Sequence, residues 1–167
     1  EASVYLYPVP GSWGFDRGWA KELLPPIEKL AKGQPDYTVR GWLRAWDPVK
    51  AKVVWEVNTS GPWQGQIFST WNGGGVMSTA SDLLFQGRGT GQLEILDART
   101  GQQVASIDVG SSMMAAPMTY LIDGEQFVAI MAGIGGARGK TYPPESAAYL
   151  YGNKGRIVAF KLGGGVV

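Results

Sequence analysis

Two strand–turn–strand segments of similar form constrain the fold of this chain more than any other feature. RAWDPVKAKVVWEV (residues 44–57) and EILDARTGQQVASIDV (94–109) each run through a strand to an aspartate, cross a short turn and continue in an apolar strand. The aspartates, Asp47 and Asp97, lie 50 positions apart. An aspartate after a strand can cap the turn by accepting hydrogen bonds from backbone N–H groups. We therefore assign both aspartates a structural role and not a catalytic one.

The spacing of these segments predicts a partial β-propeller. A period of about 40–50 residues with four strands per unit is typical of propeller blades. Alternating apolar residues and Gly or Asp turns predict strands at 42–46, 52–57, 77–80, 83–86, 92–96, 103–109, 118–122, 126–131 and 156–162. The chain is thus expected to be all-β, with about three four-stranded blades. Because closed propellers typically have about four to eight blades, we expect the rest of the propeller to complete it.

The first 40 residues differ from the rest. Ser3–Pro10 alternates for a few positions before a proline and predicts a short edge strand. A loop excursion follows, with helical content expected only in Ala20–Ala31. We therefore divide the chain into residues 1–40, a strand plus a loop and short-helix excursion, and residues 41–165, the propeller blades. The chain begins with Glu1, so we expect a processed product or a piece of a longer protein.

Composition narrows the chemistry. Hydrophobic residues make up 44% of the chain, charged residues 17%, and the net charge is +1. This balance gives no reason to expect nucleic acid as a partner. The chain has no histidine and no cysteine, so histidine bases, thiolate or histidine metal ligands, disulfides and covalent haem attachment are excluded within it. No apolar run approaches the roughly 18 residues that a membrane span requires.

The segment Trp71–Gly87, WNGGGVMSTASDLLFQG, contains the candidate binding residues. Glycine lets the backbone approach a neighbour or a ligand closely. The Trp71 indole beside such a loop could form one wall of a site for a flat, polar ligand. It could equally be an aromatic plug in the core, with the glycines only turning a corner. The residue pattern leaves both interpretations open.

Several ordered motifs resemble the pyrroloquinoline-quinone (PQQ) dependent quinoprotein and quinohemoprotein alcohol dehydrogenases, in the C-terminal part of their eight-bladed propeller. The family's tryptophan-docking motif, A-x-D-x-x-x-G-x-x-x-W, locks each blade to the next. Ala45, Asp47 and Trp55 match it, with Ala51 where the family prefers glycine. A second copy keeps Asp97 and Gly101, but Ile95 and Ala105 replace the alanine and the tryptophan.

The resemblance continues through WNGGGVMSTASDLLFQGRGTGQLEILDARTG and APMTYLIDGEQFVAIMAGIGG and ends at GRIVAFKLGGG. It covers about Gly41 to Gly165, and the ordered set is specific where any single motif would be weak. Ser81 replaces a usual glycine and Ile134 a common tryptophan. Residues 1–40 show no motif of this kind.

The resemblance implies cofactor-binding roles for Trp71, Asn72 and Gly73. PQQ is a flat quinone with three carboxylates, which suits an aromatic contact, an amide donor and a close backbone. Gly135 and Gly136, in a segment like the family's GWGG, are expected near the site entrance on weaker grounds.

The resemblance also implies what the chain lacks. The family's catalytic aspartate and its Ca²⁺ ligands lie in earlier blades, so we assign no catalytic residue and no metal ligand here. The chain alone is expected to be inactive. In the whole enzyme it would contribute a pocket wall and blade closure to oxidation of a primary alcohol to an aldehyde. The expected partners are the remainder of the propeller, a small alcohol and an electron-accepting cytochrome or quinone, in the periplasm. Haem c is expected only in a following domain.

Two alternatives remain open. A non-catalytic PQQ-repeat propeller could serve as a scaffold for protein binding, although such a protein has no need of the WNGGG segment. A sugar-oxidising relative of the same fold is a more remote alternative, since substrate choice depends on loops outside this chain.

Overall fold

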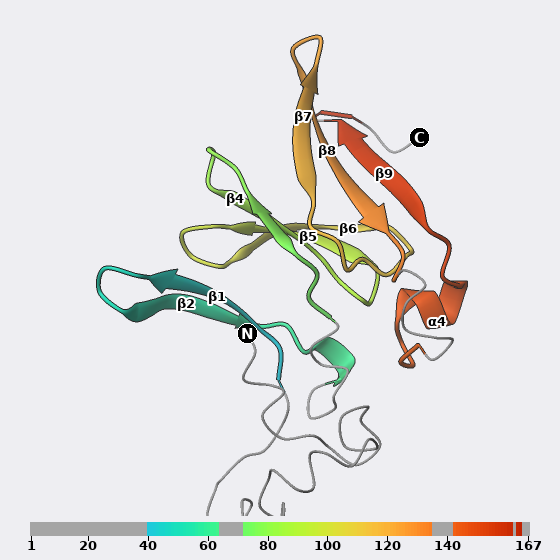
Figure 1. Ribbon diagram of the computed structural model, residues 1–167, viewed down its shortest axis with the longest axis horizontal. Helices are drawn as coiled ribbons and strands as arrows, with labels where there is room; N and C mark the ends of the chain where they lie inside the picture. Colours follow the sequence, from blue (N-terminus) through green and yellow to red (C-terminus); the bar gives the residue numbers. More distant parts are fainter. Residues whose placement is uncertain (1–39, 64–71, 135–141, 162, 165–167) are drawn as a thin grey trace, which may run out of the picture. The chain divides into compact units, whose positions relative to one another are not determined.

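The computed structural model describes residues 40–63, 72–134, 142–161 and 163–164. In these ranges nine strands form three antiparallel sheets (Figure 1). The two-stranded sheet pairs β1 with β2, the four-stranded sheet has the order β3-β4-β5-β6, and the three-stranded sheet has the order β7-β8-β9. The strands are β1 (Trp42–Asp47), β2 (Lys52–Asn58), β3 (Val76–Ser78), β4 (Leu83–Gly87), β5 (Gln92–Asp97), β6 (Gln103–Asp108), β7 (Met118–Ile122), β8 (Glu125–Ala132) and β9 (Arg156–Lys161).

This architecture confirms the predicted all-β, partial propeller fold. Each of the nine strands expected between residues 42 and 162 is present, with ends shifted by no more than two residues in the part that is described. The expectation that helical content is confined to Ala20–Ala31 is wrong, because a 3-10 turn, η2 (Gly61–Trp63), and a short helix, α4 (Ala147–Tyr151), also form. The strand and helix expected before residue 40 lie outside the described residues. Within the described ranges no helix is long and apolar enough to cross a bilayer.

The four-stranded sheet is one complete blade, and the β1–β2 hairpin repeats its last two strands. Ala45 pairs with Trp55 in the first hairpin, and Ile95 pairs with Ala105 in the second. Each ladder shifts its register directly after that pair, between Ala45 and Trp46 and between Ile95 and Leu96. The sequence repeat is therefore also a repeat of strand register, bulge included.

The aspartates cap the turns as expected. Asp47 Oδ1 accepts hydrogen bonds from the backbone N–H groups of Val49 and Lys50, both at 3.0 Å. Asp97 Oδ1 accepts from the N–H groups of Arg99 at 2.8 Å and Thr100 at 2.9 Å, and from the Thr100 hydroxyl at 3.1 Å. These bonds, led by the one from the Thr100 N–H, lower the pKa of Asp97 from its ordinary value because they favour the ionised carboxylate.

The first turn contains a backbone conformation that suits glycine better than the residue present. Ala51 has a φ of 49°, where an L-residue brings its Cβ too close to the carbonyl oxygen at a cost of about 1–2 kcal/mol. Glycine avoids this strain but loses roughly 0.5–1 kcal/mol through its more flexible unfolded state. We expect Ala51→Gly to stabilise the protein by about 0.5 kcal/mol, measured as the shift in denaturant midpoint.

A matched control for this prediction lies in the second turn. Ala98 is not among the residues with positive φ, so Ala98→Gly should lower the free energy of unfolding by roughly 0.5–1 kcal/mol. Equal loss of stability in both variants would contradict the interpretation of Ala51.

The hydrophobic core contains residues of both larger sheets. The four-stranded sheet contributes Phe85 and Leu93, and the three-stranded sheet contributes Ile130 and Ala132. Met113, which is fully buried, lies in the connection between the two sheets and pairs with Gly133 in a parallel bridge. Partly buried side chains complete the cluster, among them Val158 and Phe160 of β9, which share one face of their strand as predicted.

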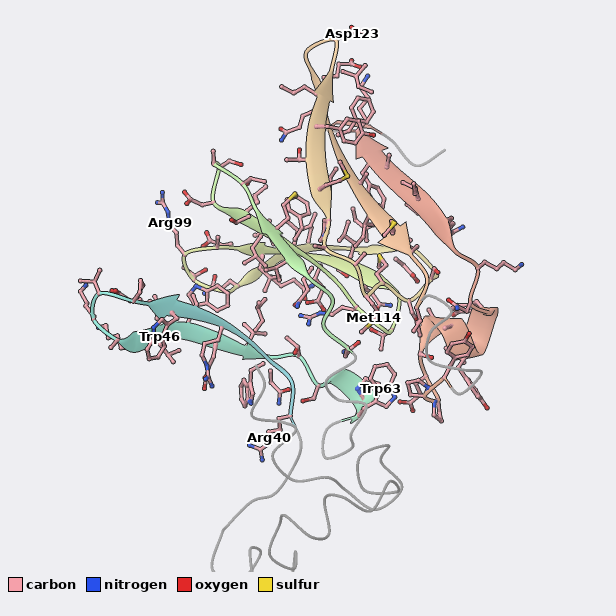
Figure 2. All side chains as sticks on the ribbon, in the orientation of Figure 1. Arg40, Trp46, Trp63, Arg99, Met114 and Asp123 are labelled. Carbon is pink, nitrogen blue, oxygen red and sulfur yellow. The ribbon has the colours of Figure 1, made fainter. Side chains whose placement is uncertain are left out.

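The hairpin tips carry polar residues, while several apolar side chains remain exposed on the strands. Figure 2 shows Arg99 and Asp123 at the ends of their hairpins. Trp46 of β1 is 55% exposed and Leu121 of β7 is 69% exposed. Exposed side chains of this size on sheet faces are typical of surfaces that another part of a protein covers.

Candidate functional site

The candidate site is the loop of residues 72–75, which leads into β3, together with the residues that hold it. The Gly74 N–H donates to the Gly87 carbonyl at 2.9 Å, and Gln86 Nε2 donates to the Gly74 carbonyl at 3.0 Å. These two bonds fasten the loop to the end of β4. Gln86 is buried, and its Oε1 has no hydrogen-bond partner among the described residues.

Two of the three consecutive glycines, Gly74 and Gly75, pack closely on the connection between β6 and β7. A Cβ on Gly74 would lie 3.0 Å from the Met113 carbonyl oxygen, and one on Gly75 would lie 2.7 Å from the Ala116 Cβ. Gly73 differs, because its Cβ would meet side chains: Gln86 Nε2 at 3.1 Å and Thr59 Oγ1 at 3.7 Å. Gly74 and Gly75 are therefore explained by the fold, and Gly73 lies against polar side chains.

The Asn72 side chain is buried and held in one orientation. Its Oδ1 accepts two hydrogen bonds from Thr90, one from the backbone N–H and one from the hydroxyl, each at 3.2 Å. Its Nδ2 faces Gly61, where an added Cβ would lie only 2.2 Å away. Among the residues that the structure describes, none accepts a hydrogen bond from Nδ2. Within the described ranges, the amide thus has its acceptor occupied and its Nδ2 donor without an acceptor.

An ion pair fixes the backbone at the same residue. Arg88 follows β4, is 3% exposed, and pairs with Glu94 of β5. Its other terminal nitrogen donates to the Asn72 carbonyl at 3.3 Å. One guanidinium therefore joins the loop to the central strand of the sheet.

The segment around α4 supports the loop of residues 88–91. The Ala147 N–H donates to the Gly89 carbonyl at 3.1 Å, and the buried Ser112 hydroxyl donates to the same carbonyl while accepting from the Ala148 N–H at 2.9 Å. The stretch before α4 is held as well, because the Trp63 indole N–H donates to the Pro144 carbonyl at 2.7 Å. Figure 2 shows Trp63 on the 3-10 turn η2, which begins at Gly61.

The structure describes two of the three predicted cofactor residues. Asn72 and Gly73 lie together at the start of the loop, whereas Trp71, Gly135 and Gly136 lie outside the described residues. Reasoning from sequence did not single out Thr90 or Arg88, because the segment Gly87-Arg88-Gly89-Thr90-Gly91 has the composition of a turn. One feature of the sequence could have indicated the ion pair: Arg88 directly follows an apolar strand, and Glu94 lies near the start of the next strand.

The described part of the site offers hydrogen-bond donors but no group suited to proton transfer beside Asn72. Across residues 40–63, 72–134 and 142–161, no cluster of three or more acidic, histidine or cysteine side chains could hold a metal ion. The described hydrogen-bond donors suit the binding and orientation of a polar ligand.

Comparison of the chain with known proteins identifies its family. Residues 28–128 match the family model "Glucose/ethanol/alcohol dehydrogenase, beta-propeller domain" of PQQ proteins. The chain is 37% identical over 129 residues to the dehydrogenase subunit of the quinone alcohol dehydrogenase of Acetobacter aceti, covering 77% of this chain and 16% of that subunit. It is 40% identical over 134 residues to lupanine 17-hydroxylase [cytochrome c] of a Pseudomonas species, covering 78% of this chain and 18% of that protein.

Solved structures agree. The quinohemoprotein alcohol dehydrogenase of Comamonas testosteroni matches with a TM-score of 0.61 and 31% identity, over 81% of this chain and 18% of that one. The quinohemoprotein alcohol dehydrogenase ADHIIG of Pseudomonas putida HK5 matches with a TM-score of 0.60 and 37% identity, over 77% of this chain and 17% of that one.

The similarity begins earlier than the motifs suggested. A quinone alcohol dehydrogenase subunit of Komagataeibacter europaeus matches over 94% of the chain at 34% identity, and so includes residues before Gly41. The chain spans less than a fifth of the length of the relatives from Acetobacter aceti and Comamonas testosteroni. The chain belongs to the β-propeller domain family of the PQQ-dependent glucose, ethanol and alcohol dehydrogenases.

Proposed function

We propose that this chain is the C-terminal propeller part of a PQQ- and calcium-dependent alcohol dehydrogenase, in which Trp71, Asn72 and Gly73 form one wall of the cofactor pocket. The observation that carries the proposal is the Asn72 amide: its Oδ1 is occupied by Thr90, while no residue in the described ranges accepts a hydrogen bond from its Nδ2. A free donor next to a tryptophan in sequence suits a flat ligand rich in carbonyl and carboxylate oxygens.

The residues present fit such a group in polarity. The donor set at the start of the loop is neutral, and Gly73 lies close to the polar side chains of Gln86 and Thr59. When bound, PQQ would supply the two-electron redox chemistry. Asn72 would donate to one of its oxygens and Trp71 would contact its plane. The binding energy of these contacts would orient the cofactor against groups from other blades.

The remainder of the propeller would supply the rest of the enzyme. It would provide the catalytic aspartate, the Ca²⁺ ligands and the neighbouring blades that cover side chains such as Trp46 and Leu121. Trp55, whose indole N–H donates to the Ala98 carbonyl at 3.0 Å, would act as the family's docking tryptophan between two blades. We propose a small primary alcohol as substrate, a cytochrome or quinone as electron acceptor, and the periplasm as location.

Reconstitution of the full-length apoprotein with PQQ and Ca²⁺ tests this function. Binding is followed by quenching of tryptophan fluorescence, and the melting temperature of the apoprotein is measured in parallel. Trp71→Ala should weaken PQQ binding about tenfold to a hundredfold, the loss of one good aromatic contact and its buried area. It should change the melting temperature of the apoprotein little.

Trp46→Ala is the control, because it removes a tryptophan of β1 that we place against a neighbouring blade and not at the cofactor pocket. Its PQQ affinity should equal that of the wild-type protein. If Trp71→Ala instead unfolds the apoprotein while the surviving protein binds PQQ normally, Trp71 is a core plug. A full-length protein that binds no PQQ would favour the alternative, a propeller that serves as a scaffold for protein binding.

A further inference from the structure

Thr90 is the residue that determines which end of the Asn72 amide is free. An unconstrained asparagine side chain can turn over, exchanging its carbonyl oxygen and its NH₂ group. Here Oδ1 receives both the backbone N–H and the hydroxyl of Thr90, each at 3.2 Å. The reversed amide would set two N–H donors of Asn72 against the Thr90 N–H. The reversed orientation is thus disfavoured, and Nδ2 stays on the side that faces Gly61, where none of the described residues accepts its hydrogen bond.

Two further contacts hold the amide where Thr90 can reach it. Arg88 donates to the Asn72 backbone carbonyl at 3.3 Å, and that guanidinium is in turn fixed by Glu94. Gly61, with a φ of 57°, leaves space for Nδ2 that any other residue would fill. Position and orientation are therefore controlled by different residues: Arg88 positions the backbone of Asn72, and Thr90 orients its side chain.

We propose that Thr90 is a positioning residue for the cofactor, which acts through Asn72 and does not touch the cofactor itself. This inference rests on the proposed function, and it adds that the site presents an N–H donor to an oxygen of the bound quinone. Thr90 thereby gains a functional role, although its segment, residues 87–91, has only the composition of a turn.

The test is a double-variant cycle in the full-length protein, with the PQQ dissociation constant from fluorescence quenching as readout. Thr90→Val removes the hydroxyl and keeps the backbone N–H, so PQQ affinity should fall about fivefold to tenfold. Thr90→Ser keeps the hydroxyl and should stay within about twofold of wild type. In an Asn72→Ala background, Thr90→Val should have no further effect, because Thr90 acts only through that amide.

A matched control comes from the β5–β6 turn, where Thr100 donates its N–H and its hydroxyl to Asp97 Oδ1 in the same manner. Thr100→Val removes an equivalent hydrogen bond and should leave PQQ affinity unchanged. Asn72→Asp replaces the free donor by an oxygen and should weaken binding more than Thr90→Val does. Where Thr90→Val gives no folded apoprotein by thermal melting, Thr90→Ala takes its place in the cycle.

The outcomes separate the two proposals. If the wild-type protein binds no PQQ, or Asn72→Ala binds as wild type does, the proposed function of this loop fails, and this inference fails with it. If Asn72→Ala weakens binding but Thr90→Val does not, the role of Thr90 alone is wrong. The role of Thr90 is also wrong if Thr90→Val lowers PQQ affinity by the same factor in the wild-type and the Asn72→Ala proteins. Such a result would indicate a structural effect that does not depend on the Asn72 amide.

Discussion

Replacing Glu94 by alanine should destabilise the protein by about 3 kcal/mol, because it leaves the Arg88 guanidinium buried without a counter-charge. The Arg88 side chain is 4% exposed and that of Glu94 is 23% exposed, so water can replace only part of the lost interaction. Glu94→Gln keeps a neutral acceptor for one N–H and should cost less, roughly 1–2 kcal/mol. The measurement is the free energy of unfolding from guanidinium denaturation at neutral pH.

The surface pair Arg44–Glu56 is the matched control. It also joins an arginine to a glutamate, at 2.8 Å, but both side chains are close to half exposed. Glu56→Ala should therefore cost about 0–1 kcal/mol, as exposed ion pairs usually do. If the two alanine variants lose the same stability, the buried pair has no special energetic role.

A double replacement separates stability from positioning at this pair. Apolar residues of similar volume often substitute for a buried ion pair with little loss of stability, so Arg88→Met with Glu94→Leu should recover most of the stability lost in Glu94→Ala. It should not restore the hydrogen bond from residue 88 to the Asn72 carbonyl. The double variant is thus expected to fold well and to bind PQQ more weakly than wild type.

The strands of this fold were predictable because their information is local. Alternating side chains indicate strands such as β9. Asp47 and Asp97 mark the β1–β2 and β5–β6 turns through bonds to residues two and three positions away. The helix α4 was missed because its stability is not local. Ser146 caps it within the segment, but Ala147 and Ala148 are held by Gly89 and Ser112, which lie far away in sequence.

The candidate site was predictable only in part for the same reason. The motif predicted Asn72, but the partners that orient it, Thr90 and Arg88, are 18 and 16 residues away and carry no pattern of their own. The sequence left open whether the glycine run lets the backbone approach a ligand or only turns a corner. At Gly74 and Gly75 the nearby atoms belong to residues 113–116. No repeat in the sequence relates these two stretches, so their contact could not be predicted.

Gly101→Ala should destabilise the protein by about 3–5 kcal/mol, through the contact between β2 and the β5–β6 turn. Gly101 has a φ of 74°, and an added Cβ would lie 2.6 Å from Trp55 Cε3 and 2.8 Å from Cδ2. The backbone strain costs about 1–2 kcal/mol, and forcing the indole away costs about 1–3 kcal/mol more. A displaced indole also loses its 3.0 Å hydrogen bond to the Ala98 carbonyl, worth about 1 kcal/mol.

Gly124→Ala separates strain from collision, and a double-variant cycle then assigns the collision to Trp55. Gly124 lies in the β7–β8 hairpin with a φ of 80°, and nothing lies within 4 Å of an added Cβ, so its alanine variant should cost only the strain, about 1–2 kcal/mol. In a Trp55→Ala background the indole is gone, and Gly101→Ala should fall to that same cost. Because contacting residues couple in such cycles, a Gly101→Ala penalty that stays undiminished without the indole would mean that Trp55 does not hold the two hairpins together.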